Sequence, residues 1–177
     1  MGRFAGVRPA KRGSAARAGG LRSMRYVPTM LVQAVWAFPQ TLAGLAVFAA
    51  YRGRPHFPYR GAVVTLWGRP YQSMSLGPFL FLEGNLEGFM NPDAPDHEKL
   101  QRILVHEYGH TVQSLILGPL YLPLVGLPSA VWANVPRLKA RRHRLASSYY
   151  AFWPERSANW LGERVLKRPS MGQAVID

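Results

Sequence analysis

The chain contains no cysteine among its 177 residues. Disulfide bonds and cysteine-ligated metal sites are therefore excluded, and any bound metal ion has to be held by histidine or carboxylate side chains. Acidic residues are also few, with 9 Asp and Glu against 22 Lys and Arg and a net charge of +13. A positive excess of this size suits a polyanionic partner, either nucleic acid or an anionic lipid surface.

The sequence also lacks the patterns typical of nucleic-acid-binding proteins, such as zinc-finger, RRM-like or helix-turn-helix motifs. Most of its bases, 16 of the 22, instead occur in three acid-free blocks, each beside an apolar stretch: residues 1–27, 51–70 and 137–144. This arrangement favours membrane lipids as the partner and argues against nucleic acid. No pattern in the sequence predicts an oligomeric state.

Length and composition predict one folded domain with additional segments. Residues 1–25 are rich in Arg, Gly and Ala, and we expect a basic disordered tail. Residues 26–51 carry no charge and are long enough to cross a bilayer, so we expect a hydrophobic anchor helix with a kink near Pro39. The alternative is a buried core helix. The folded domain is then expected over 52–168, followed by a tail over 169–177.

The domain itself is predicted to be α+β and mainly helical. Residues 61–67 and 73–82 are rich in strand-forming residues and flank a Gly68-Arg69-Pro70 turn, which predicts a small antiparallel β-hairpin. Apolar residues at helical spacing predict a helix over 97–117, ended by Gly118-Pro119.

Two further segments follow that helix. The apolar stretch 115–135 is interrupted by prolines and glycines, which predicts a bent apolar hairpin and not a straight span. A last helix is predicted over about 145–167, where Pro154 either interrupts it or marks its true start.

The segment His106-Glu107-Tyr108-Gly109-His110 lies within the predicted central helix. Its two histidines are four residues apart, so both imidazoles project from one helix face and can reach one metal ion. Glu107 lies beside the first of them and can accept a proton from a water molecule without binding the metal. We therefore expect His106 and His110 to bind Zn²⁺ and Glu107 to be the catalytic base.

A third ligand is needed, and the remaining histidines suit the role poorly. Glu155 opens a predicted helix among aromatic residues, where a carboxylate is costly unless a cation is nearby. Asn159, one turn later, faces the same way and can orient a histidine ligand. We expect Glu155 to bind the metal, the alternative being an ion pair with Arg156 or Arg144. Gln113 is expected to be a satisfied core amide, and Gly109 to allow a neighbouring element to approach closely.

HEYGH followed by Glu155-Arg156-Ser157-Ala158-Asn159 resembles the gluzincin metallopeptidases, most closely the membrane-bound CAAX prenyl proteases and HtpX-like proteases. Those families have Asp where this chain has Asn159. The fragments 36–40 and 117–122 are similar to segments of small bacterial membrane proteins that carry HExxH. The resemblance implies a zincin-like helix, Zn²⁺ as cofactor, a peptide or protein substrate aligned on a strand edge near 73–82, and the bacterial inner membrane as the location.

A topological condition follows from this ligand set. If residues 115–135 crossed a bilayer, Glu155 would lie on the side opposite His106 and His110, so this segment has to fold back. The predicted function is a zinc-dependent membrane-associated metallopeptidase. The alternative is a non-hydrolytic metal-binding membrane scaffold or regulator that retains the site.

Overall fold

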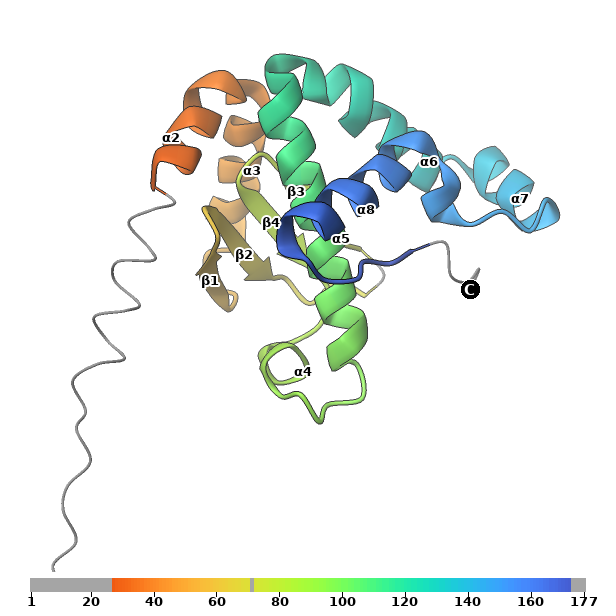
Figure 1. Ribbon diagram of the computed structural model, residues 1–177, viewed down its shortest axis with the longest axis horizontal. Helices are drawn as coiled ribbons and strands as arrows, with labels where there is room; N and C mark the ends of the chain where they lie inside the picture. The colour runs from red at the N-terminus through yellow and green to blue at the C-terminus, as the bar shows by residue number, and fades with distance from the viewer. Residues whose placement is uncertain (1–26, 71, 173–177) are drawn as a thin grey trace, which may run out of the picture.

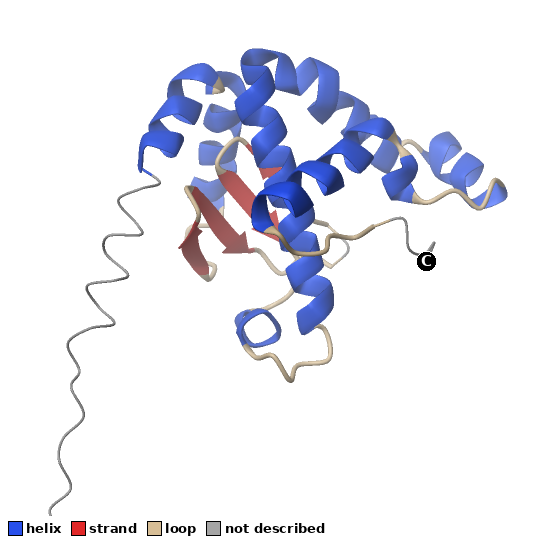
Figure 2. Cartoon of the chain, viewed as in Figure 1, coloured by secondary structure: helices blue, strands red, loops and turns tan. Residues whose placement is uncertain are grey.

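A computed structural model describes residues 27–70 and 72–172 (Figure 1). Within them the chain forms seven α-helices and one small four-stranded sheet, which confirms the mainly helical α+β class (Figure 2). In chain order the elements are α2 (Val27–Trp36), α3 (Phe38–Ala50), β1 (His56–Tyr59), β2 (Ala62–Leu66), β3 (Met74–Leu76), β4 (Phe79–Leu82), α4 (Leu86–Met90), α5 (His97–Leu117), α6 (Leu127–Asn134), α7 (Pro136–Arg144) and α8 (Trp153–Leu166), with short helical turns at Gly118–Leu120, Leu122–Gly126 and Tyr149–Ala151. The predicted tail over 1–25 lies outside the described residues.

The sheet has the strand order β1-β2-β4-β3, and its central pair, β2 with β4, is parallel. The predicted antiparallel hairpin between 61–67 and 73–82 is therefore wrong. Gly77 adopts a left-handed φ of 61° and lies with Pro78 in a turn, so 73–82 forms a hairpin of its own, β3–β4. This turn leaves the other edge of β4 available for β2.

Alternation along β4 separates two apolar layers. Leu80 and Leu82 belong to the main core with Leu104 of α5, whereas Phe79 and Phe81 belong to a second cluster with Phe48 of α3. The sheet is thus sandwiched between α3 on one face and α5 on the other, and α8 packs on α5 (Figure 1).

The single anchor helix expected over 26–51 is instead two helices, α2 and α3, which meet at Ala37. Pro39 explains the break, because a proline is tolerated in the first turn of a helix but not in its interior. Gln40 of α3 is buried and donates from Nε2 to Ser114 Oγ and to the Gly118 carbonyl oxygen. The N-terminal helices are therefore joined to the end of α5 by polar contacts.

The chain turns sharply after α5, as predicted. Gly118 ends α5 with a φ of 55°. The helical segment Leu122–Asn134 is bent by 119° relative to the helical segment His97–Leu120. Among the described residues, we find no individual helix with the length and apolar character needed to cross a bilayer. Two bent pairs meet those criteria together, Thr29–Trp36 with Phe38–Ala50, bent by 108°, and His97–Leu120 with Leu122–Asn134.

Two glycines allow α5 and α8 to touch through their backbones. A Cβ atom on Gly109 would lie 1.9 Å from the carbonyl oxygen of Ala158, and one on Gly162 would lie 2.1 Å from that of Val105. Any side chain at either position would force the helices apart. The close approach expected at Gly109 is confirmed, and it sets the N-terminal half of α8 against the histidine face of α5.

Candidate metal centre

The centre of the site is the middle of α5. His106 and His110 lie one turn apart on the same face, with ring centroids 4.8 Å apart and an interplanar angle of 85°. Both rings are buried, as is Glu107 between them in sequence. Burial of three titratable side chains on one helix is costly in free energy unless each has a polar partner. The partners have to come from the elements that pack against α5.

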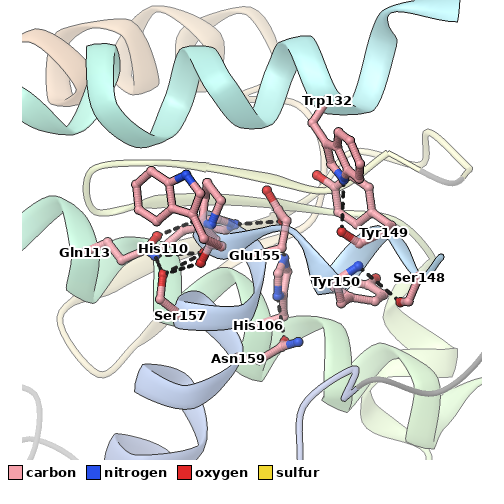
Figure 3. Close-up of polar contacts among 12 residues, drawn as sticks. His106, His110, Gln113, Trp132, Ser148, Tyr149, Tyr150, Glu155, Ser157 and Asn159 are labelled. Carbon is pink, nitrogen blue, oxygen red and sulfur yellow. Dashed lines mark hydrogen bonds and ion pairs between the residues drawn. The ribbon is translucent and has the colours of Figure 1, made fainter. Parts of the chain in front are cut away.

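α8 supplies the partner. Pro154 lies in the first turn of α8, so the helix begins at Trp153 and the carboxylate of Glu155 points at the two imidazoles (Figure 3). Glu155 Oε2 lies 3.2 Å from His106 Nε2 and 3.4 Å from His110 Nε2. One ligand atom from each of the three residues lies within 4.8 Å of the other two. The structure thus brings together the three side chains that the sequence singled out, and Glu155 makes neither of the arginine ion pairs considered as alternatives.

The far side of each imidazole is held by an amide. His106 Nδ1 is 2.8 Å from Asn159 Oδ1, and His110 Nδ1 is 2.7 Å from Gln113 Oε1. The Gln113 orientation is fixed independently, because its Nε2 donates to the Pro154 carbonyl oxygen and to Ser157 Oγ. An amide oxygen only accepts, so each Nδ1 carries the proton.

That tautomer has a consequence for the other ring nitrogen. In a neutral imidazole protonated at Nδ1, the Nε2 atom presents a lone pair, and here both lone pairs face the same carboxylate oxygen. Three facing lone pairs repel unless a cation lies among them. That cation is either a proton on an imidazole or a metal ion.

The spacing fits a metal ion as well as a proton. Donors that each lie about 2.0–2.1 Å from a tetrahedral zinc ion are roughly 3.3 Å from one another. The distances from Glu155 Oε2 to the Nε2 atoms of His106 and His110, 3.2 and 3.4 Å, match this value. Glu155 Oε1 has no hydrogen-bond partner although it is buried, which leaves a second oxygen of the same carboxylate available.

Glu107 occupies the remaining part of the site. Its Oε2 atom is buried and has no hydrogen-bond partner. Burial raises the pKa of this carboxyl, while the nearby histidines oppose the rise and Glu155 adds to it. A carboxyl with a raised pKa and an unsatisfied oxygen beside a cation site is suited to accept and return a proton.

The other histidines lie elsewhere. His97 contacts the Gly88 carbonyl oxygen, His56 is exposed on β1, and His143 is exposed on α7. Among the described residues, the His106, His110 and Glu155 group is the one cluster with metal-ligand spacing.

Three tyrosines surround the site. The sequence offers one of them, Tyr149, as a candidate oxyanion donor, and it does not indicate the other two. Burial, reinforced by the carboxylates of Glu107 and Glu155, raises the pKa of Tyr121, Tyr149 and Tyr150, so their hydroxyls stay protonated. The Tyr150 ring also packs edge-on against His106 at 5.1 Å. A protonated hydroxyl of this kind can donate a hydrogen bond to a developing oxyanion. Tyr121 already lies beside Ser75 and Tyr149 beside Glu155, which leaves Tyr150 as the candidate donor. Tyr121 and Tyr150 were missed because their elements approach α5 only through tertiary packing.

Gln113 was expected to be a satisfied core amide, which is correct but incomplete. Its position three residues after His110 on the same helix face was the signal that could have revealed its role. It fixes the His110 ring in the way that Asn159 fixes His106.

Substitution of Asn159 by Ala is expected to weaken zinc binding about 10–100-fold, because His106 loses the acceptor that sets its tautomer and ring orientation. Asn159→Asp should bind zinc at least as tightly as the natural chain, since a carboxylate makes the imidazole more basic. Competition with a fluorescent zinc chelator measures both. Equal affinities in Asn159→Ala and the natural chain would show that this contact does not support the ligand.

The pKa values of the ligand set predict opposite pH responses with and without metal. Burial alone lowers the pKa of His110, but the hydrogen bond and charge of Glu155 and the charge of Glu107 raise it from 6.5 to about 9. Burial alone raises the pKa of Glu155, but the two histidines hold it well below its ordinary value of 4.5. The metal-free protein therefore gains stability from Glu155 above pH 4.5 and from His110 below pH 6.5.

We expect the metal-free protein, kept in chelator, to lose thermal stability as the pH rises from 6.5 to about 9, because the His110 proton is lost over that range. Stabilisation by added zinc should increase over the same range, since the metal competes with that proton. Melting temperatures measured by circular dichroism in chelator and in zinc therefore diverge with pH. Parallel curves would contradict this prediction.

Comparison of the chain with protein-family models, with curated proteins and with solved structures gave no match.

Proposed function

We propose that the protein is a zinc-dependent, membrane-associated metallopeptidase with a gluzincin-like site, in which His106, His110 and Glu155 hold the ion and Glu107 is the general base. The observation that carries this proposal is the arrangement of the two Nε2 atoms around Glu155 Oε2, with both Nδ1 protons held by amide oxygens. A pair of Nε2 lone pairs and a carboxylate oxygen at these separations is a donor set that suits Zn²⁺.

Zinc, when bound, supplies Lewis-acid activation of water and polarisation of a carbonyl group. The other tasks fall to the chain. Glu107 takes a proton from the attacking water and returns it to the leaving amine nitrogen, so no net proton is consumed by the enzyme. A tyrosine hydroxyl at the site, protonated because of its raised pKa, donates a hydrogen bond to the oxygen that becomes negatively charged.

β3 is the proposed place for the substrate. It lies at one edge of the sheet, pairs with β4 and packs against α5. An extended peptide can add to such an edge through backbone hydrogen bonds, which aligns a peptide bond beside the adjacent helix. This mode requires no particular side chain from the substrate at the paired positions.

Elemental analysis of the purified full-length chain tests the metal, and a mixed-sequence peptide library followed by mass spectrometry tests hydrolysis. We expect near-stoichiometric zinc and cleavage that is lost on chelation and restored by zinc. Bound zinc without cleavage would reject the peptidase in favour of a non-hydrolytic role for the same site. A protein that contains no metal, and takes up none at pH 8, would reject both.

A further inference from the structure

The two bends of the chain, at Ala37 and at Gly118, are in direct contact through side-chain hydrogen bonds and packing. Trp36 Nε1 donates to the Leu115 carbonyl oxygen at 3.1 Å, and the Trp36 ring packs so closely on Gly118 that a Cβ atom there would lie 2.5 Å from it. Gln40 Nε2 donates to the Gly118 carbonyl oxygen at 2.7 Å. The bends therefore form one ridge, at the upper edge of the molecule in Figure 1, from which α6 leads to α7.

Large apolar side chains project into solvent from this ridge and from the segment that follows it. Val35 is 82% exposed, Ile116 61% and Leu127 62%, which is unusual for residues of this kind in a folded domain. The exposed set, here called the apolar ridge, comprises Leu31, Val35, Trp36, Phe38, Ile116, Leu120, Leu124 and Leu127. No Lys, Arg, Asp or Glu occurs within 26–51 or 108–136, the segments that carry it.

A basic helix adjoins this apolar surface. α7 contains five Lys and Arg and no acidic residue, and it follows α6 after a single residue. Arg142 turns inward, where its guanidinium lies 4.9 Å from the Trp132 ring centroid and 5.5 Å from that of Tyr149. The other four are exposed: Arg137, Lys139, Arg141 and Arg144.

We propose that the apolar ridge and α7 together dock the protein onto an anionic lipid bilayer, with the ridge inserted among the acyl chains and the four exposed bases of α7 against the headgroups. An uncharged apolar surface beside a purely basic one matches the two layers of an anionic membrane surface. This inference specifies the membrane association included in the proposed function, and it does not require the metal centre to be catalytic.

Such docking would place the candidate metal centre close to the bilayer. His110 precedes Gly118 by eight residues on α5, which corresponds to roughly 12 Å along a helix axis. α6 and α7 are both linked to the site through Tyr149, which lies beside Glu155. Trp132 of α6 donates from Nε1 to the Tyr149 carbonyl oxygen, and the guanidinium of Arg142 of α7 lies over the Tyr149 ring.

Co-sedimentation of the full-length protein with lipid vesicles, in chelator, tests the proposal without reference to zinc or hydrolysis. We expect strong binding to vesicles that contain phosphatidylglycerol, weak binding to phosphatidylcholine alone, and loss of binding at high salt. Replacement of Arg137, Lys139, Arg141 and Arg144 by Gln should weaken binding to anionic vesicles by at least about 100-fold. A matched control replaces four exposed bases that belong neither to the apolar ridge nor to α7: Arg52, Arg54, Arg60 and Arg168.

The control variant is expected to bind as the natural chain does. If it loses as much binding as the α7 variant, the attraction is a general effect of net charge and the proposal is overturned. The same conclusion follows if the α7 variant binds normally, which would point to the basic residues of 1–25 instead.

Insertion of the ridge can be measured directly because the chain has no cysteine of its own. A polarity-sensitive fluorophore on Leu127→Cys should shift to the blue on anionic vesicles, and one on Gly53→Cys, a site with open space around it, should not. Light scattering tests the alternative that the ridge is an interface between copies of the chain. If Leu127→Ser dissociates an oligomer and leaves vesicle binding unchanged, the ridge is an interface between copies of the chain and the proposal fails.

Discussion

Glu107→Gln is expected to lower the rate of the proposed zinc-dependent peptide hydrolysis by about 10²–10⁴-fold and to leave the zinc content of the protein unchanged. The physical reason is that the amide has nearly the same shape but cannot accept the proton of the attacking water. Because Glu107 is buried and its Oε2 has no partner, the neutral amide should not lower the melting temperature. Single-turnover kinetics with a peptide found in the library, together with zinc analysis, measure both effects.

The matched control for this substitution is Glu98→Gln. Glu98 is on the same helix, but its side chain is 78% exposed and is paired with Arg102 on the surface. Its replacement should leave rate, zinc content and stability close to those of the natural chain. If Glu107→Gln retains hydrolysis near the natural rate, Glu107 is not the base. If it loses zinc, its role is to hold the ion.

Glu155→Ala is expected to abolish zinc retention during purification, with a loss of affinity larger than the 10–100-fold associated with an orienting residue such as Asn159. Glu155 is 1% exposed, and its Oε2 lies 3.2 Å from His106 Nε2 and 3.4 Å from His110 Nε2. Hydrolysis should disappear together with the metal. Isothermal titration of the metal-free variant with zinc gives the affinity, and circular dichroism shows whether the chain is still folded.

Two variants keep this second prediction interpretable. Arg156→Ala changes the next residue of α8, which is exposed, and should retain zinc. Glu155→Gln removes the charge but fills the same space, so it separates loss of the ligand from loss of packing. Full zinc content in folded Glu155→Gln would mean that a different group supplies the third donor.

Local features of the sequence predicted the elements that carry the site. The apolar spacing between Leu100 and Ile116 defines α5, Gly118 ends it, and Pro154 marks the start of α8. These signals act within a few residues, because helix periodicity, glycine with positive φ and proline in a first turn depend on the local backbone.

The sheet could not be predicted in the same way. In the sheet β2 pairs in parallel with β4, although β3 lies between these two strands in the sequence. Whether β2 pairs with β3 or with β4 depends on which strand edge the Gly77-Pro78 turn leaves open. The break between α2 and α3 was placed correctly near Pro39. The sequence did not predict the bend of 108° or the contacts that Gln40 and Trp36, on either side of it, make with the end of α5.

By itself, the sequence determined the chemistry available to this protein. Without cysteine, the strongest possible metal site was the histidine pair four residues apart, with Glu107 beside it and Glu155 and Asn159 on a later helix. Only the tertiary structure decided that these groups meet. Gly109 against Ala158 and Gly162 against Val105 bring α5 and α8 into backbone contact, and this contact sets Glu155 between the two imidazoles. Contacts between residues so far apart in sequence are set by packing, which local spacing does not encode.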